Sequence, residues 1–588
     1  MSINNMLRKT CILLCALMVT LTHASPQQTL QQLIDDEWQL RMRNNPLFAT
    51  SNGVHDYNHL LPDVSDVQQQ KYREQQAALL TRANAIEQDK LSQNEQINLG
   101  LLKWILEDRI TGIDNGHSRI NMNTFTDFTS SAVRGIEQMP LKSVQDFDNY
   151  LARMRALPTY FKQHTAWLQK GLDTGLTQPK IVMQGIAPVI ARQVYDNPTE
   201  SRLYSTAEKY ITNLPESQRN RYLQQVKQAI EQHVTPAFAA LRDFLQQQYI
   251  PNTRESVGIV DAPGGKDYYA SQIKWYVTTT DYSAEQIHQI GLTEVARIKA
   301  EMLDLMKEVE FTGSFTEFQQ FLRSDPQFYA KTAKELLMHA TFIANRIDAE
   351  LPRFFGKLPR LPYSIQPVPD SIAPNYTTAA YWPAPIGGDS AGTYVLNTYQ
   401  LDQRPLYELT ALTLHESVPG HHFQNALSQE LEGVAPFRRK LYLSAFGEGW
   451  GLYTEKLGVE MGVYDSPYEH FGRLSYEMWR ACRLVIDTGI HAMGWTRQQG
   501  LDYLSDNSML SLANVRAEVD RYISWPGQAL SYKMGEIKIW ELRNRAEKAL
   551  GEQFDIKAFH DLVLSNGAVT LHMLDDSVNR YIREATKD

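Results

Sequence analysis

Long amphipathic stretches constrain the fold of this chain more than any other feature of its sequence. From about residue 29 to 248 the chain is rich in Leu, Gln, Glu, Ala and Lys, with apolar residues three and four positions apart. We expect breaks at Pro158 and at residues 213–215. Helical periodicity dominates again after residue 399. Because 588 residues, 43% of them hydrophobic, can bury a large core, the sequence predicts a mainly α-helical globular protein.

A short stretch between these helical blocks has β character. Prolines are dense from residue 358 to 385, which favours loops or short strands, and residues 393–399 are rich in β-branched and aromatic side chains. We therefore expect a small β-sheet just before the second helical block. A loop signal at residues 261–265 suggests an N-terminal helical region over residues 25–250 and a second region over residues 251–588.

Residues 1–24 have the features of an export signal. Arg8 and Lys9 precede an apolar run that is too short to span a bilayer comfortably, and Ala24 ends a plausible cleavage site. An uncleaved anchor or a buried N-terminal helix is the alternative. A lipoprotein signal is disfavoured, because Leu14 stands before Cys15 where a small residue is typical. We expect a periplasmic or secreted protein with no stable membrane insertion.

Charge and cysteine content narrow the function classes. The net charge is -9, and loss of the two cationic residues of the signal would make it -11, which argues against a broad nucleic-acid or anionic-lipid surface. We expect no nucleic-acid partner. After cleavage Cys482 is the one remaining cysteine, so the mature chain has no internal disulfide and depends on its core for stability.

The densest chemical signal is the sequence HESVPGHH at residues 415–422, in a predicted helix that begins near Leu406. Zinc binds imidazole nitrogen and carboxylate oxygen at about 2.0–2.2 Å, and a His-Glu pair on one helix offers both a ligand and a general base. His415 is therefore the predicted first ligand and Glu416 the predicted base. The alternative is that the histidines are structural and that Glu416 is a surface acid.

The second ligand is either His422 or His421. On a straight helix His422 lies within about 20° of the face of His415, while His421 points about 120° away, and this geometry favours His422. A kink at Pro419 and Gly420 would swing His421 inward instead.

Glu448 is the predicted third ligand. It stands between two glycines at the start of a helical stretch, 26 residues after His422, a spacing that suits two antiparallel helices. Glu455 lies two turns farther along the same face and is either a supporting group or a solvated acid.

These motifs resemble a large bacterial family catalogued as domain of unknown function 885. The resemblance rests on residues 415–422 and covers roughly residues 30–585 through further blocks at residues 263–264, 268–269, 287–292, 448–450, 487–491 and 525–529. That family is similar to helical zinc peptidases of the gluzincin kind, including carboxypeptidase Taq, thimet-type oligopeptidases and angiotensin-converting enzyme.

The resemblance implies a large helical body with a deep cleft and a small β-sheet beside the zinc helix, and residues 251–588 would form its zinc-peptidase-like part. It implies one zinc per chain, held by two histidines and one glutamate, with Glu416 as general base. Short peptides, or peptides trimmed at their C-termini, are the implied substrates.

Four further positions are candidate supporting groups. In zinc peptidases of this type an edge strand before the zinc helix holds the substrate backbone, which assigns Gly392 and Tyr394 to substrate binding unless that strand is an ordinary one. Asp487 and His491 share a helix face, so the carboxylate could orient the imidazole toward a developing oxyanion; a structural core histidine is the alternative. Tyr532 is a candidate phenol donor to that oxyanion.

A substrate carboxylate would need a cationic partner, and Arg521 and Lys533 are the candidates on either side of the Pro526-Gly527 break.

Two rival functions are weaker. The pattern G-x-S-x-G at residues 388–392 would make Ser390 a serine-hydrolase nucleophile, but prolines precede it and a predicted strand follows, whereas that motif requires a strand before and a helix after. A non-catalytic metal-binding protein of the same fold is the other alternative. It has no need of a base such as Glu416 beside its ligands.

Overall fold

Helices form most of the chain in the computed structural model, which describes residues 24–370, 372–385 and 390–587. The expected export signal therefore lies outside the described residues, apart from Ala24. The N-terminal half contains α1 (Pro26–Asn44), α2 (Pro46–Ser51), α3 (Asp66–Asn84), α4 (Gln93–Asp114), α5 (Phe128–Glu137), α6 (Val144–Thr174), α7 (Lys180–Ala191), α8 (Arg202–Tyr210), α9 (Glu216–Ala229), α10 (Thr235–Phe244) and α11 (Ile250–Asn252).

The second half continues with α12 (Gly265–Val277), α13 (Ala284–Glu308), α14 (Phe315–Ser324), α15 (Ala333–Phe354), β1 (Tyr363–Pro367), β2 (Ala379–Trp382), β3 (Gly392–Leu396), α16 (Leu409–Glu416), α17 (His421–Gln429), α18 (Ser444–Met461), α19 (Pro467–Ala492), α20 (Arg497–Asn507), α21 (Leu512–Ser524), α22 (Ser531–Leu550), α23 (Ile556–Leu564) and α24 (Leu571–Ala585). The predicted mainly helical fold with a small sheet is confirmed.

The expected break at Pro158 is wrong, because α6 runs through it without interruption. Tyr150, Met154, Leu157 and Phe161 are buried on one face of this helix, and that packing outweighs the loss of one backbone hydrogen bond at the proline. The expected break at residues 213–215 is confirmed, since α8 ends at Tyr210 and α9 begins after Pro215.

The sheet has three short strands in the order β1-β3-β2. Strand β3 pairs in parallel with β1 and antiparallel with β2, so that Tyr394 lies between Ile365 and Tyr381. The expectation that Gly392 and Tyr394 belong to an edge strand is therefore wrong. Both edges of β3 are already hydrogen-bonded, and the Tyr394 side chain is fully buried. The edge strand that packs against α16 is β2.

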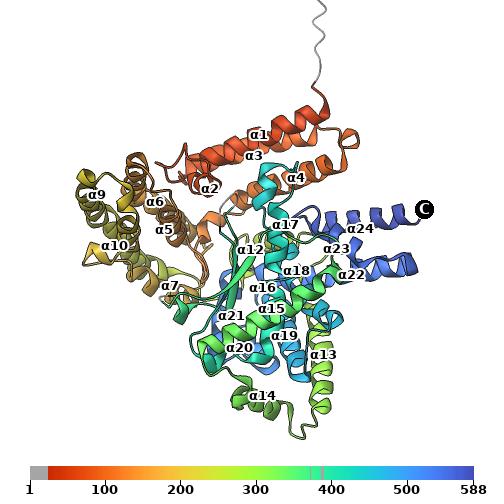
Figure 1. Ribbon diagram of the computed structural model, residues 1–588. Helices are drawn as coiled ribbons and strands as arrows, with labels where there is room; N and C mark the ends of the chain where they lie inside the picture. Colours follow the sequence, from red (N-terminus) through yellow and green to blue (C-terminus); the bar gives the residue numbers. More distant parts are fainter. Residues whose placement is uncertain (1–23, 371, 386–389, 588) are drawn as a thin grey trace, which may run out of the picture.

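Two large hydrophobic clusters each combine both halves of the chain. The first joins buried residues of α5 to α10 with residues of α13, α19, α20 and α21. The second joins α1, α3 and α4 with α15 to α18 and α22 to α24. In Figure 1 the helices α5 to α10 form a lobe on the left, and α16 and α18 lie near the centre of the view. Among the residues described, no helix combines the length and apolar character needed to cross a membrane.

Candidate metal centre

The helix that carries the HESVPGHH motif breaks in the middle of it. Helix α16 ends at Glu416 and α17 begins at His421, so residues 417–420 form a tight connection. Gly420 lies directly against the end of α16, where a Cβ atom would overlap the carbonyl oxygens of Leu414 and His415. Glycine is therefore required at this position for the chain to fold back so closely.

This break places His421, and not His422, beside His415. The rings of His415 and His421 are nearly perpendicular, with centroids 4.7 Å apart. His422 points toward the sheet, where its Nδ1 lies 3.1 Å from the hydroxyl of Tyr381 and its ring packs on Tyr363. The preference for His422 assumed a straight helix, and the turn before His421 removes that assumption.

Glu448 on α18 completes a three-residue cluster with these two imidazoles. Its Oε2 lies 3.5 Å from Nε2 of His415 and 3.5 Å from Nε2 of His421. All three potential ligand atoms lie within 4.8 Å of one another. Ligands bound to a tetrahedral zinc ion lie about 3.4 Å apart, so the donor types and spacing of this cluster fit zinc.

Glu455 determines which nitrogen of His415 faces the cluster. Its Oε1 lies 2.8 Å from Nδ1 of His415, and both side chains are buried. Because a carboxylate only accepts hydrogen bonds, Nδ1 of His415 carries a proton, and Nε2 is the ring nitrogen that faces Glu448. Of the two roles that the sequence left open for Glu455, the structure places it as a supporting group.

Tyr442 holds Glu448 from the other side. Its hydroxyl donates to Oε1 of Glu448 over 2.5 Å, which leaves Oε2 directed at the two imidazoles. Sequence reasoning missed this residue, because no spacing rule links a tyrosine in the loop before α18 to a carboxylate on that helix.

The glycines around Glu448 make room for this arrangement. A Cβ atom at Gly451 would lie 2.7 Å from the ring of His415, and one at Gly447 would lie 2.6 Å from the ring of Tyr442. Between them, a Cβ atom at Gly449 would lie 2.5 Å from the backbone of Gly535. The repeated glycines therefore let α18 approach both the ligand on α16 and the backbone of α22.

The cluster favours a positive charge at its centre. Burial alone would lower the pKa of His415, but the carboxylates of Glu448 and Glu455 raise this pKa to about 10. Burial would raise the pKa of Glu448, yet the imidazoles of His421 and His415 hold it well below its ordinary value. A metal cation bound between the three side chains would meet the same electrostatic field.

Glu416 and Tyr532 lie close to the cluster. Glu416 is the half-buried last residue of α16, and its charge acts on His415, Tyr376 and Tyr442. Tyr532, at the start of α22, is within electrostatic reach of Tyr442.

His491 does not have the expected role. Its Nδ1 accepts from the backbone N–H of Ile259, and its Nε2 donates to the carbonyl of Tyr522, so both ring nitrogens are occupied. Burial lowers the pKa of His491 to about 3. Asp487 bonds to Tyr269 and to the N–H of Gly527 instead of orienting His491. This histidine is a buried structural link between segments.

Lys533 is also committed to the protein interior. Its ammonium group contacts carboxylate oxygens of Glu294, Glu477 and Glu536 at 2.9, 2.8 and 2.7 Å, and it is almost fully buried. Its three N–H donors are therefore occupied, and none is left to bind a substrate. Arg521, in contrast, keeps part of its side chain exposed.

The serine-hydrolase alternative finds no support in the local fold. Ser390 is exposed, and the residues after it form strand β3, where the motif requires a helix. The glycine and aspartate before Ser390 lie outside the described residues.

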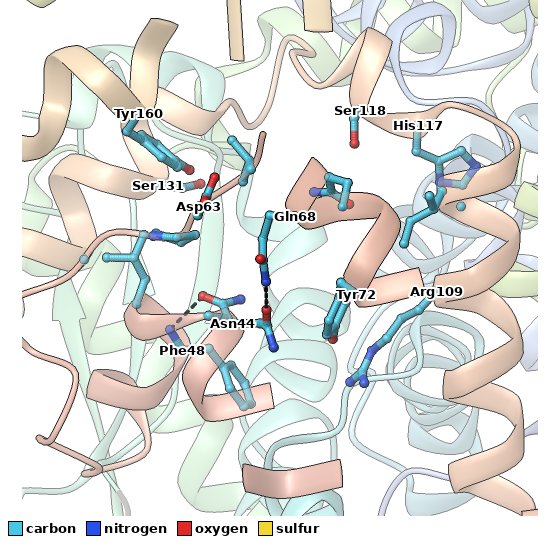
Figure 2. A pocket seen from close by; sticks show the side chains of 18 of the residues that line it. Asn44, Phe48, Asp63, Gln68, Tyr72, Arg109, His117, Ser118, Ser131 and Tyr160 are labelled. Atoms are coloured by element: carbon cyan, nitrogen blue, oxygen red, sulfur yellow. Dashed lines mark hydrogen bonds between the residues drawn. The ribbon is translucent and has the colours of Figure 1, made fainter. Parts of the chain in front are cut away.

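Two adjoining cavities lie beside the N-terminal helices, and the smaller of them is also lined by residues of the second half of the chain. The first, of about 660 Å³, is lined mainly by polar side chains of α3, α4 and α5 and by the α1–α2 junction. Figure 2 shows Gln68 and Asn44 hydrogen-bonded in its centre, with Tyr160 and Ser131 on one side and His117 on the other. A second cavity of about 330 Å³ shares Ser131 and Tyr160 and extends to Trp525. Sequence reasoning did not find either.

Solved structures show the same fold. A crystal structure described as "the putative lipoprotein from Colwellia psychrerythraea" matches with a TM-score of 0.89 and 27% identity, covering 95% of this chain and 100% of the other. A Shewanella oneidensis protein described as a "putative lipoprotein of unknown function" matches with a TM-score of 0.72 and 18% identity, covering 94% and 99%.

No protein with a curated description matches this sequence. The family model described as "Bacterial protein of unknown function (DUF885)" matches residues 46–578, which include every residue of the candidate metal centre. Because this match extends over nearly the whole chain, the protein belongs to the DUF885 family.

Proposed function

We propose that this protein is an exported zinc-dependent peptidase that acts on short peptides or trims peptide C-termini. The observation that carries the proposal is the cluster of His415, His421 and Glu448, in which two ligands are held by further hydrogen bonds and a free carboxylate, Glu416, stands one residue after the first ligand. A purely structural cluster has no need of that extra acid.

His415 and His421 would bind one zinc ion through Nε2, and Glu448 through Oε2. A zinc ion bound there supplies Lewis acidity toward a peptide carbonyl and lowers the pKa of water. Glu416 would accept the proton of the attacking water and transfer it to the amine that leaves. Tyr532, which lies within electrostatic reach of Tyr442, is the proposed hydrogen-bond donor to the oxyanion.

The resemblance of the sequence motifs to gluzincin peptidases implies a cleft that admits short peptides, and we propose the two adjoining cavities as parts of it. Export is supported by the signal-like residues 1–24 and by the description of both structural relatives as putative lipoproteins.

Metal content of the purified full-length protein tests the proposal most directly. We expect about one zinc per chain in the wild type and in His422→Ala, and loss of zinc in His415→Ala, His421→Ala and Glu448→Ala. His422→Ala is the matched control, because His422 neighbours the ligands in sequence but contacts Tyr381 instead. A wild type that cannot be loaded with zinc refutes the metal centre.

Glu416→Gln separates catalysis from metal binding. This variant should keep its zinc and lose about 10²–10⁴-fold in kcat on a peptide substrate, because it removes the general base. If zinc-loaded wild type cleaves no member of a broad peptide library, the protein is a metal-binding protein without peptidase activity.

A further inference from the structure

Three arginines gather around Tyr532, directly beside the candidate metal centre. Arg480 and Arg483 come from α19, and Arg521 comes from α21. The guanidinium carbons of Arg483 and Arg480 lie 4.3 and 6.0 Å from the centre of the Tyr532 ring. The guanidinium of Arg521 also lies within electrostatic reach of the Tyr532 hydroxyl. We call Arg480, Arg483 and Arg521 the arginine cluster.

The arginine cluster carries more positive charge than its neighbours balance. Glu518 contacts Arg483 at 2.9 Å and Arg521 at 3.6 Å. Glu455 is 3.8 Å from Arg480 and is already hydrogen-bonded to His415. Glu408 also interacts electrostatically with Arg480, and it shares that interaction with Arg404. The three guanidinium groups therefore have one carboxylate, Glu518, to themselves and share two others, Glu455 and Glu408, with His415 and Arg404.

The hydrogen-bonding capacity of the arginine cluster is also incompletely used. Nε of Arg480, Nη1 of Arg483 and Nε of Arg521 are buried and have no hydrogen-bond partner among the described residues. The side chains of Arg480 and Arg483 are only 8% and 2% exposed. Burying guanidinium groups without full pairing is costly, so retaining three of them favours a site for an anion.

The arginine cluster lies between the metal centre and the smaller cavity. On one side, Arg480 approaches Glu455, which holds His415. Tyr532 is within electrostatic reach of Tyr442, which holds Glu448. On the other side, the guanidinium of Arg521 lies 5.9 Å from the ring of Trp525, which lines the cavity.

Arg521 is the member that a ligand reaches. Its side chain is 16% exposed, whereas the other two are almost fully buried behind it. The ring of Phe125, itself 68% exposed, stacks on Trp525 and lies 5.1 Å from the guanidinium of Arg521. The accessible cation is thus flanked by two aromatic rings.

We propose that the arginine cluster binds the free α-carboxylate of the peptide substrate, with Arg521 making the direct contact. This inference rests on the proposed peptidase function and deepens it, because it makes the enzyme a carboxy-terminal exopeptidase. The planar guanidinium suits a carboxylate, Arg480 and Arg483 add charge from behind, and Phe125 with Trp525 offers an apolar surface for the terminal side chain.

Matched peptides test the proposal on the full-length wild type without any mutation. Each peptide is prepared with a free C-terminal acid and with a C-terminal amide, and a third form has the amide plus a glutamate as its last residue. We expect kcat/KM to be about 10–100-fold higher for the free acid than for either amide, mainly through KM, because the charge-assisted contact is lost in the amides.

Arg521→Gln should lower kcat/KM for the free acid by that same factor and leave kcat/KM for the amides unchanged. For the free acid, kcat/KM of Arg521→Lys should fall between the values of Arg521→Gln and wild type. Arg497→Gln is the control, because Arg497 is partly buried like Arg521 but forms an ion pair with Asp520 on α21. All variants should keep their zinc, which separates this effect from damage to the metal centre.

Equal hydrolysis of acid and amide by wild type overturns the carboxylate site and leaves the proposed function standing. Equal kcat/KM values for the free acid and for the amidated peptide that ends in glutamate also overturn it. The site would then recognise a side-chain carboxylate and not the α-carboxylate. If no peptide is cleaved, the proposed function fails. In that case, calorimetry measures the affinity of the protein for the acid and amide forms of each peptide. Equal affinities refute a carboxylate site at the arginine cluster.

Discussion

A single hydrogen bond at Glu455 decides how His415 meets the cluster. The carboxylate accepts from Nδ1 of His415, so Nε2 is free to act as a ligand. The identity of His421 as its partner depends equally on one residue, Gly420, because a side chain there would collide with the end of α16. At the scale of residues, the candidate site is thus determined by neighbours of the ligands as much as by the ligands.

Glu455→Gln should weaken zinc binding about 10–100-fold, because a neutral amide orients and polarises His415 less than a carboxylate does. Chelator competition measures the change in Kd. Glu460→Gln is the control on the same helix, since Glu460 pairs with Arg543 and is 41% exposed. Equal zinc affinities for Glu455→Gln and the control would show that Glu455 has no supporting role.

At the scale of elements, the close approach of α18 and α22 positions Glu448 and Tyr532. Gly449 and Gly535 meet where the two helices pack, and a Cβ atom at Gly535 would overlap the carbonyl oxygen of Ala445. Larger side chains at these two positions would force the helices apart and separate Glu448 from Tyr532.

Gly535→Ala should therefore lower the free energy of unfolding by about 1–3 kcal/mol, because it overpacks a tight helix contact. Gly185→Ala is the matched control. Gly185 is an exposed glycine in α7 with open space around it, so alanine there should stabilise the protein by about 0.5–1 kcal/mol. Urea unfolding measures both changes, and a Gly535→Ala protein as stable as wild type would contradict the packing argument.

At the scale of the whole molecule, the N-terminal region and the second region share their cores. Each of the two large hydrophobic clusters draws buried residues from both. Residues 251–588 alone would expose one face of α19, α21 and α22 to water, and residues 25–250 would expose the complementary faces.

We expect the full chain to unfold in one transition, with circular dichroism and tryptophan fluorescence giving the same midpoint. A fragment of residues 251–588 should show no cooperative unfolding. The finding that would contradict this is a separate folded unit, seen as two resolved transitions or as a stable fragment.

Sequence periodicity was sufficient for the helical fold and for the position of the small sheet, because both depend on side chains that are close together along the chain. The same holds for the types of residue in the candidate metal centre. His415, Glu416 and Glu448 stand in motifs whose spacing limits their chemistry. The structure brings two of the three predicted ligands, His415 and Glu448, together with His421, the alternative to His422.

Long-range contacts decided the rest. His421 replaced His422 because a turn fits against the end of α16, and Pro158 stays inside α6 because the face around it is buried. His491 and Lys533 have chemistry that suits catalysis or binding, yet both are saturated by partners from distant segments. Local sequence determined which functional side chains the protein contains. Tertiary packing determined which of these side chains keep an atom free to bind a ligand, because burial and pairing depend on residues far away in the chain.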